Sequence, residues 1–159
     1  MMRRPRRGRI GVAWAVRARP LTDRDVRAAV RAALAHGRRP DLDVDVALVS
    51  DRRLATIHAR FLGDPSPTDV IAFDLGADGG GPAAEIYASV DCARRVARER
   101  DVDAASELRL YLVHGALHLC GYDDLRPAAR RLMRAAEDAV LASLRGTRGG
   151  RPYKKNEKT

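Results

Sequence analysis

The segment His114-Gly-Ala-Leu-His-Leu-Cys-Gly-Tyr-Asp-Asp124 decides how the end of this chain must fold, and the other elements can be placed around it. His114 and His118 are four residues apart, so on a helix both imidazoles project from one face about one turn apart. Gly121 is expected to end that helix, because glycine adopts the left-handed backbone that reverses the chain. Asp124 follows His118 by six residues and becomes available as a third ligand. The segment therefore predicts a metal site made by His114, His118 and Asp124.

The spacing His-x-x-x-His-x-x-Gly-x-x-Asp is that of the metzincin zinc proteases, with aspartate in place of their third histidine. A zinc ion with three protein ligands keeps a water molecule in its open position and lowers the pKa of that water. The protease motif also requires a glutamate directly after the first histidine, as the general base. That position is Gly115 here, so the pattern predicts a metal centre without the base that peptide hydrolysis needs.

Several residues of the segment have a second interpretation. Asp124 is also a candidate N-cap for the following helix, with Pro127 in its first turn. Cys120 or Asp123 as a fourth ligand would make a closed, structural zinc site, although a buried core thiol is the more ordinary role for Cys120. Cys92 and Cys120 form no zinc-finger or disulfide pattern, which favours a reducing cytoplasm.

The segment resembles the signature of the YbeY family of metal-dependent endoribonucleases, His-Gly-x-Leu-His-Leu-x-Gly-Tyr-Asp-His. It departs from that signature at Asp124, which replaces a histidine. A second stretch, Phe61-Leu-Gly-Asp-Pro-Ser-Pro-Thr-Asp-Val-Ile-Ala-Phe73, is similar to the family's other motif, which ends in Pro-Thr-Asp-Val-Leu-Ser-Phe. The two motifs occur in the family's order and together span residues 61–124.

This resemblance implies a zinc-dependent, single-strand-specific endoribonuclease in the cytoplasm, acting in rRNA maturation or ribosome quality control. It implies one Zn²⁺ per chain, RNA as the partner, and a groove lined by Thr68, Asp69 and Arg60. In register with Thr68, however, the family's usual arginine position falls on Leu62 rather than on Arg60. The alternative function is an RNA- or ribosome-binding protein whose zinc is structural. A metalloprotease is a third hypothesis, disfavoured by Gly115.

Charge is unevenly distributed along the 159 residues, which carry a net charge of +9. Residues 1–9 and 145–159 hold eleven of the 30 basic residues and one of the 21 acidic residues, so the remainder is nearly neutral. We expect a basic arm over residues 1–9, a single domain over 10–146 and a basic, disordered tail over 147–159. Basic arms suit a polyanionic partner such as RNA. No apolar run approaches the roughly 20 residues of a membrane-spanning helix.

Hydrophobic periodicity predicts strands and helices that alternate and then end in helices. Strands are expected at residues 10–16, 44–48, 70–73 and 85–90, and helices at 22–37, 51–62, 91–100, from near Glu107 to Gly121, and at about 125–144. Asp91 is expected to cap the third helix, while Phe61 and Leu132 are expected on apolar faces. The glycine-rich stretch 76–82 lacks the lysine and hydroxyl of a phosphate loop and is interpreted as a plain connection. The predicted fold is α+β, one mixed four-stranded sheet packed with helices, with the metal site on the last two helices and their connecting turn.

Overall fold

A computed structural model describes residues 2–63, 68–76 and 83–146 of the chain. The expected disordered tail and most of the glycine-rich connection, residues 147–159 and 77–82, lie outside these ranges. The described elements, in chain order, are β1 (Ile10–Trp14), α1 (Asp23–His36), β2 (Val44–Val49), α2 (Asp51–Leu62), β3 (Val70–Asp74), β4 (Ala84–Ser89), α3 (Val90–Arg100), α4 (Ala104–Leu119) and α5 (Pro127–Arg145).

The four described strands form one mixed sheet in the order β1-β2-β4-β3. β1, β2 and β4 are parallel to one another, whereas β3 pairs antiparallel with β4 at the edge. Val12, Val46 and Ile86 stand opposite one another across the three parallel strands. Side chains alternate between the two faces of a strand, so this register places the apolar residues of neighbouring strands on one face. The predicted class, α+β with a mixed four-stranded sheet, is confirmed.

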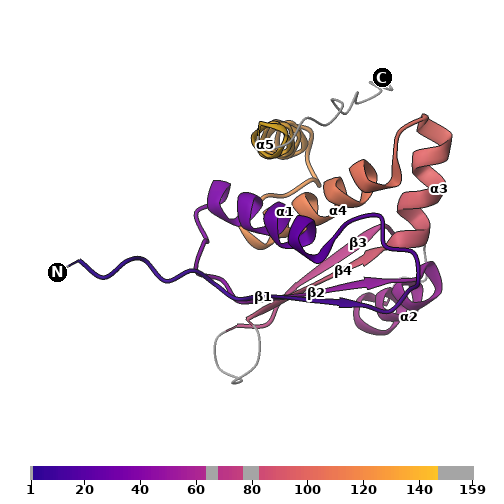
Figure 1. The fold of residues 1–159 in the computed structure, drawn as a ribbon, viewed down its shortest axis with the longest axis horizontal. Coiled ribbons are helices and arrows are strands. Elements are labelled where there is room, and N and C mark those ends of the chain that lie inside the picture. The colour runs from indigo at the N-terminus through magenta and orange to yellow at the C-terminus, as the bar shows by residue number, and fades with distance from the viewer. Residues whose placement is uncertain (1, 64–67, 77–82, 147–159) are drawn as a thin grey trace.

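The helices cover the two faces of the sheet unequally (Figure 1). α1 and α4 lie on one face, and α5 lies across them on the side away from the sheet. On the opposite face α2 packs against β3 and β4 through a smaller cluster that includes Leu54, Ile57 and Ile71. α4 is therefore enclosed between the sheet and α5. No helix in the described ranges has both the length and the apolar character needed to cross a bilayer.

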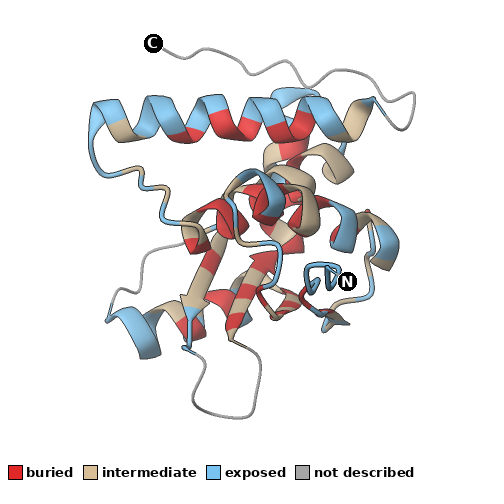
Figure 2. Cartoon of the chain, turned by 90° about the vertical axis from the view of Figure 1, so that its left-hand side faces the viewer, coloured by how far each residue is buried: buried red, intermediate tan, exposed pale blue. Residues whose placement is uncertain are grey.

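Burial on almost every side of α4 fixes its position. Leu108, Leu112 and Leu117 are 0% exposed. Figure 2 shows the buried residues on the sides of the helices and strands that face the interior of the domain. The helix begins at the N-cap Asp103, whose carboxylate accepts a hydrogen bond of 2.7 Å from the backbone N–H of Ser106. Since a helix buried on most of its sides cannot easily shift, the side chains near its C-terminus are held in place.

Two residues expected on apolar faces are exposed instead. Leu132 is 66% exposed because the inward stripe of α5 passes through Met133, Ala136 and Val140. Phe61 is 63% exposed, because it lies in the last turn of α2, beyond the buried contacts of Leu54 and Ile57. Its ring still meets the edge of Phe73, with centroids 5.8 Å apart.

The expected cap of α3 is also wrong. Ser89 is the N-cap, and its hydroxyl accepts a hydrogen bond of 3.0 Å from the backbone N–H of Cys92. Asp91 lies inside the helix, where its carboxylate accepts a bond of 2.9 Å from the backbone N–H of Asp51. Both serine and aspartate are strong N-caps, so sequence preference alone does not choose between two residues this close together.

The basic N-terminal segment is attached to the sheet at its inner end. Arg6 forms an ion pair of 2.8 Å with Asp43, and the backbone N–H of Arg9 donates to the other oxygen of that carboxylate at 2.7 Å. The Arg9 hydrogen bond, followed by that of Arg6, lowers the pKa of Asp43. Part of the positive charge of this segment is therefore already paired with acidic residues of the domain.

Candidate metal centre

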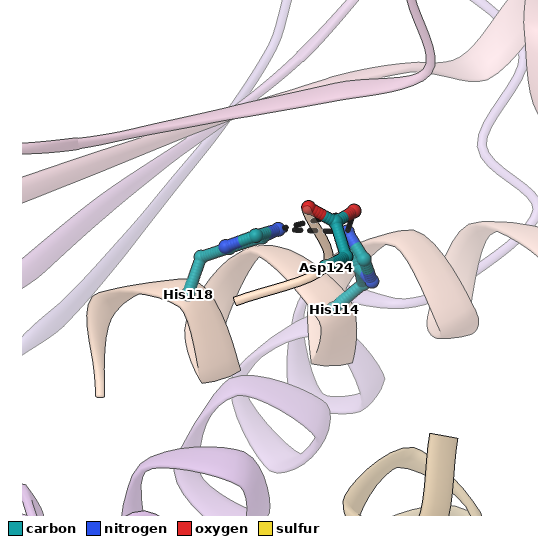
Figure 3. A group of neighbouring side chains, drawn as sticks. All are labelled: His114, His118 and Asp124. Atoms are coloured by element: carbon teal, nitrogen blue, oxygen red, sulfur yellow. Dashed lines mark hydrogen bonds and ion pairs between the residues drawn. The ribbon is translucent and has the colours of Figure 1, made fainter. Parts of the chain in front are cut away.

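The three predicted ligands converge at the C-terminal end of α4 (Figure 3). The Nε2 atoms of His114 and His118 are 3.0 Å apart. The Oδ2 atom of Asp124 lies 3.5 Å from Nε2 of His114 and 3.7 Å from Nε2 of His118. Two imidazole nitrogens and a carboxylate oxygen thus face a common point, the arrangement that the spacing in the sequence predicts.

These separations fit a bound metal ion. Zinc lies about 2.0–2.2 Å from nitrogen and oxygen ligands, so ligand atoms of a tetrahedral site stand roughly 3.3–3.6 Å from one another. The three observed separations of 3.0, 3.5 and 3.7 Å bracket that range. The side chains of His114, His118 and Asp124 are 25, 33 and 43% exposed, so the point they share is open to solvent on one side. The donor set can therefore hold a metal ion and leave a position for water.

The turn after α4 brings Asp124 back beneath the histidines. Gly121 has φ of +92°, a conformation that favours glycine, and its backbone N–H donates to the carbonyl of His118 at 3.0 Å. Arg39 donates to the carbonyl of Leu119 at 2.6 Å and so links this helix end to the loop before β2. The predicted role of Gly121 as the residue that reverses the chain is confirmed.

The cap interpretation of Asp124 is not supported. The N-cap of α5 is Arg126, without a side-chain capping bond, and Pro127 occupies the first turn as expected. The carboxylate that does bind the backbone here belongs to Asp123, which accepts from the N–H of Leu125 at 2.7 Å. Asp123 thus shapes the turn, while Asp124 points its carboxylate at the two histidines.

Cys120 does not join the cluster. Within the described parts of the chain, the group of close potential ligands contains the two histidines and Asp124, with neither Cys120 nor Asp123. Cys120 packs closely on Gly37: a Cβ atom added to Gly37 would lie 2.3 Å from the Sγ atom of Cys120. Burial raises the pKa of the Cys120 thiol, which disfavours the thiolate that binds zinc. A structural site closed by Cys120 or Asp123 therefore finds no support in the geometry.

Sequence inspection missed Glu137, which lies on the inner side of α5 behind His114. Its Oε2 atom is 3.7 Å from Nδ1 of His114, on the ring nitrogen opposite the one that faces the cluster. The Glu137 side chain is only 8% exposed. A carboxylate at the second nitrogen of a ligating histidine fixes its tautomer and orientation. The signal in the sequence was a glutamate on the buried stripe of α5, one residue after Ala136.

Two opposing effects act on the pKa of His114. Burial lowers the pKa, whereas the Glu137 carboxylate and, more weakly, Asp124 and Asp69 raise it; the net result is a pKa above the ordinary value. The acidic surroundings thus favour a positive charge at this point. A divalent cation carries such a charge, so the same electrostatics favours metal binding once the histidines are neutral.

Packing explains why no general base follows His114. A Cβ atom on Gly115 would lie 3.1 Å from Cγ2 of Val70 and 3.3 Å from Cγ2 of Ile86, on the sheet beneath α4. The position therefore faces the sheet, and a glutamate side chain there would have to enter the core. The absence of the protease base follows from the way in which α4 rests on β3 and β4.

The structure separates the three residues expected in a substrate groove. Asp69 is exposed and close enough to His114 for its charge to contribute to the raised pKa of that histidine. Thr68 is half-buried beside it, just before β3 begins at Val70. Arg60 stands on the last turn of α2, with its guanidinium carbon 5.6 Å from the centroid of the Phe61 ring. No described contact joins Arg60 to the metal cluster.

The fold and this cluster define a class: α+β proteins with a His-His-Asp group able to hold a metal ion at the end of an enclosed helix. The family model described as Endoribonuclease YbeY matches residues 17–145. That match covers well over half of the chain, and the chain belongs to the YbeY family.

Individual relatives agree with this membership. The protein named Endoribonuclease YbeY from Anaeromyxobacter sp. (strain Fw109-5) is 39% identical over 128 residues, which is 79% of this chain and 66% of that protein. The one from Syntrophotalea carbinolica is 37% identical over 113 residues, 67% of this chain and 75% of that protein. The solution structure of TM1509 from Thermotoga maritima matches with a TM-score of 0.55 at 24% identity, over 92% of this chain and 99% of that one, and so supports the fold. This chain spans just under two thirds of the Anaeromyxobacter protein.

Proposed function

We propose that this protein is a zinc-dependent endoribonuclease that cuts single-stranded RNA in the cytoplasm, in rRNA maturation or ribosome quality control. The observation that carries the proposal is the convergence of Nε2 of His114, Nε2 of His118 and Oδ2 of Asp124 within 3.7 Å of one another. Membership of a family described as endoribonucleases supports the same activity. When bound, one zinc ion per chain would polarise a phosphoryl oxygen and lower the pKa of a coordinated water.

The protein's own side chains orient and charge the centre. Glu137 interacts with Nδ1 of His114, so that Nε2 of that ring stays directed at the cluster. Asp124 contributes a negative charge where the related signature has a neutral histidine. The formal charge of a zinc complex falls from +2 to +1 as a result, which makes a coordinated water less acidic than in a three-histidine site. We expect the activity optimum to lie at correspondingly higher pH.

RNA is a better substrate than a peptide for this arrangement. Gly115 presses against Val70 and Ile86, so the position of the protease glutamate has no room for a carboxylate. Phosphodiester cleavage relies mainly on charge stabilisation at the phosphate, which a metal ion supplies. We assign Thr68 and Asp69, which lie just before β3, to the RNA groove together with Arg60 on α2.

Cleavage of single-stranded RNA with and without a chelator tests the proposal. We expect zinc-loaded protein to cut the RNA, chelated protein to leave it intact, and added zinc to restore cleavage. His118→Ala should abolish cleavage, whereas His58→Ala on α2 removes a histidine outside the cluster and should retain it. An unfolded protein offered as substrate should remain intact. Chelator-sensitive proteolysis without RNA cleavage would overturn the proposal.

A further inference from the structure

The first half of α5 carries an exposed group of arginines, here called the α5 arginine cluster. From Arg126 to Ala136 the chain has four arginines and no acidic residue: Arg126, Arg130, Arg131 and Arg134. The last three line a surface hollow of about 370 Å³ together with Pro127. Elsewhere arginines such as Arg6 and Arg95 are paired with aspartates. Across the described ranges, by contrast, no ion pair involves a member of the α5 arginine cluster.

The α5 arginine cluster begins two residues after the candidate ligand Asp124. Arg134 and Arg130 precede Glu137 by three and seven residues and are exposed, whereas Glu137 is buried against α4. At a rise of 1.5 Å per residue they lie about 5 and 10 Å along the helix axis from Glu137, which contacts His114. Arg126 follows Asp124 by two residues. Figure 2 shows the exposed outer side of α5 above its buried stripe.

Three acidic residues close to the α5 arginine cluster in sequence are directed elsewhere. The Asp123 carboxylate accepts the backbone N–H of Leu125, and the Asp124 carboxylate faces the histidines. Glu137 is buried against His114. Keeping several guanidinium groups together on one helix is unfavourable without anions, because like charges four residues apart repel. Planar guanidinium groups bind phosphate oxygens in a bidentate manner, so a phosphate backbone complements this surface.

We propose that the α5 arginine cluster binds the backbone phosphates of single-stranded RNA next to the phosphate that lies at the metal centre. This inference rests on the proposed endoribonuclease function and extends its substrate site from α4 onto α5. Contacts to flanking phosphates are made equally in the bound substrate and in the transition state. They therefore lower KM without raising kcat, and they give the binding a dependence on salt but none on base identity.

The test compares two double variants of the full-length chain that each remove two positive charges. Arg130→Gln/Arg134→Gln alters the α5 arginine cluster. Arg94→Gln/Arg98→Gln alters two exposed arginines with the same four-residue spacing on α3 and serves as the matched control. Binding of a labelled single-stranded RNA is measured on chelated protein, and kcat and KM on zinc-loaded protein, over a range of salt concentrations. Thermal unfolding checks that both variants remain folded.

We expect the α5 variant to bind RNA roughly tenfold more weakly than the α3 variant. The slope of log affinity against log salt should fall by about 1.4, because each single-strand phosphate contact contributes about 0.7. KM should rise with kcat nearly unchanged. If the wild-type protein cuts RNA and the α5 and α3 variants have the same RNA affinity and KM, the inference about the arginines is overturned and the proposed function stands. If the wild-type protein does not cut RNA, the proposed function is overturned. An α5 variant that binds RNA normally but no longer binds phosphatidylserine vesicles would assign the cluster to a membrane surface instead.

Discussion

Replacing Glu137 by glutamine tests whether the second nitrogen of His114 is held by a carboxylate. The substitution keeps the size of a side chain that is only 8% exposed, so the packing of α5 on α4 should survive. It removes the negative charge whose oxygen lies 3.7 Å from Nδ1 of His114. The expected result is weaker zinc binding, because the imidazole loses both its preferred tautomer and part of its basicity.

The expected loss of zinc affinity in Glu137→Gln follows from the distance between Glu137 and His114 and from the burial of Glu137. Two unit charges 3.7 Å apart interact by about 4.5 kcal/mol at an effective dielectric constant of about 20. A metal-bound histidine is neutral, and its N–H carries only part of a unit charge, so the loss should be a fraction of that figure. Removal of such partners typically costs 10–100-fold in metal affinity, about 1.4–2.8 kcal/mol.

Zinc affinity is measured by competition with a chromophoric chelator for wild type, Glu137→Gln and the control Asp138→Asn. The control makes the same change from carboxylate to amide on the exposed side of the same helix and should bind zinc within about twofold of wild type. The free energy of unfolding of each metal-free protein is measured in urea. Wild-type zinc affinity in a folded Glu137→Gln protein would refute the positioning role of Glu137.

Three further predictions concern packing and pH. Gly115→Ala should destabilise the fold by about 1–3 kcal/mol despite the better helix propensity of alanine, because its Cβ would lie 3.1 Å from Cγ2 of Val70; an unchanged urea midpoint would contradict this. Leu132→Lys should change the free energy of unfolding by less than about 0.5 kcal/mol, since Leu132 is 66% exposed. A large decrease in that free energy would show that Leu132 is packed in the core. In the metal-free protein the pKa of His114 is raised, in part by Glu137. The interaction of the two residues therefore stabilises the fold fully at pH values below the pKa that His114 has in the unfolded chain. This stabilisation is lost as the pH rises through the pKa that His114 has in the folded protein. Glu137→Gln should therefore destabilise the metal-free protein more at pH near 5.5 than near 8.5, and a pH-independent difference would disprove that linkage.

The sequence alone was sufficient to predict those features that depend on interactions between residues a few positions apart. α1 begins where the sequence predicts a helix, directly after the N-cap Thr22, and it is started by a capping box between Thr22 and Asp25, two residues within one turn of each other. The two histidines and the reversal at Gly121 follow from helix geometry and from the conformational freedom of glycine. Asp124 could be placed because only a short turn separates it from α4.

Features that depend on contacts between distant segments could not be predicted. Glu137 is 23 residues from His114, and its role appears only once α5 is folded back across α4. The net charge of residues 10–144 is close to zero, so the overall charge balance did not reveal the α5 arginine cluster. The cluster becomes apparent only when its arginines are placed together on one helix. Phe61 fits an apolar stripe in the sequence, but α2 reaches beyond its buried contacts, so its ring is exposed.

The most direct test of the central claim, that His114, His118 and Asp124 form one zinc site, is titration calorimetry of the metal-free protein with zinc. The decisive comparison is between Asp124→Ala and Asp123→Ala, since these adjacent aspartates differ in whether their carboxylate faces the histidines. We predict one zinc per chain for wild type, retained in Asp123→Ala and weakened at least tenfold in Asp124→Ala. Equal, tight zinc binding by the two variants would contradict the assignment of Asp124 as a ligand.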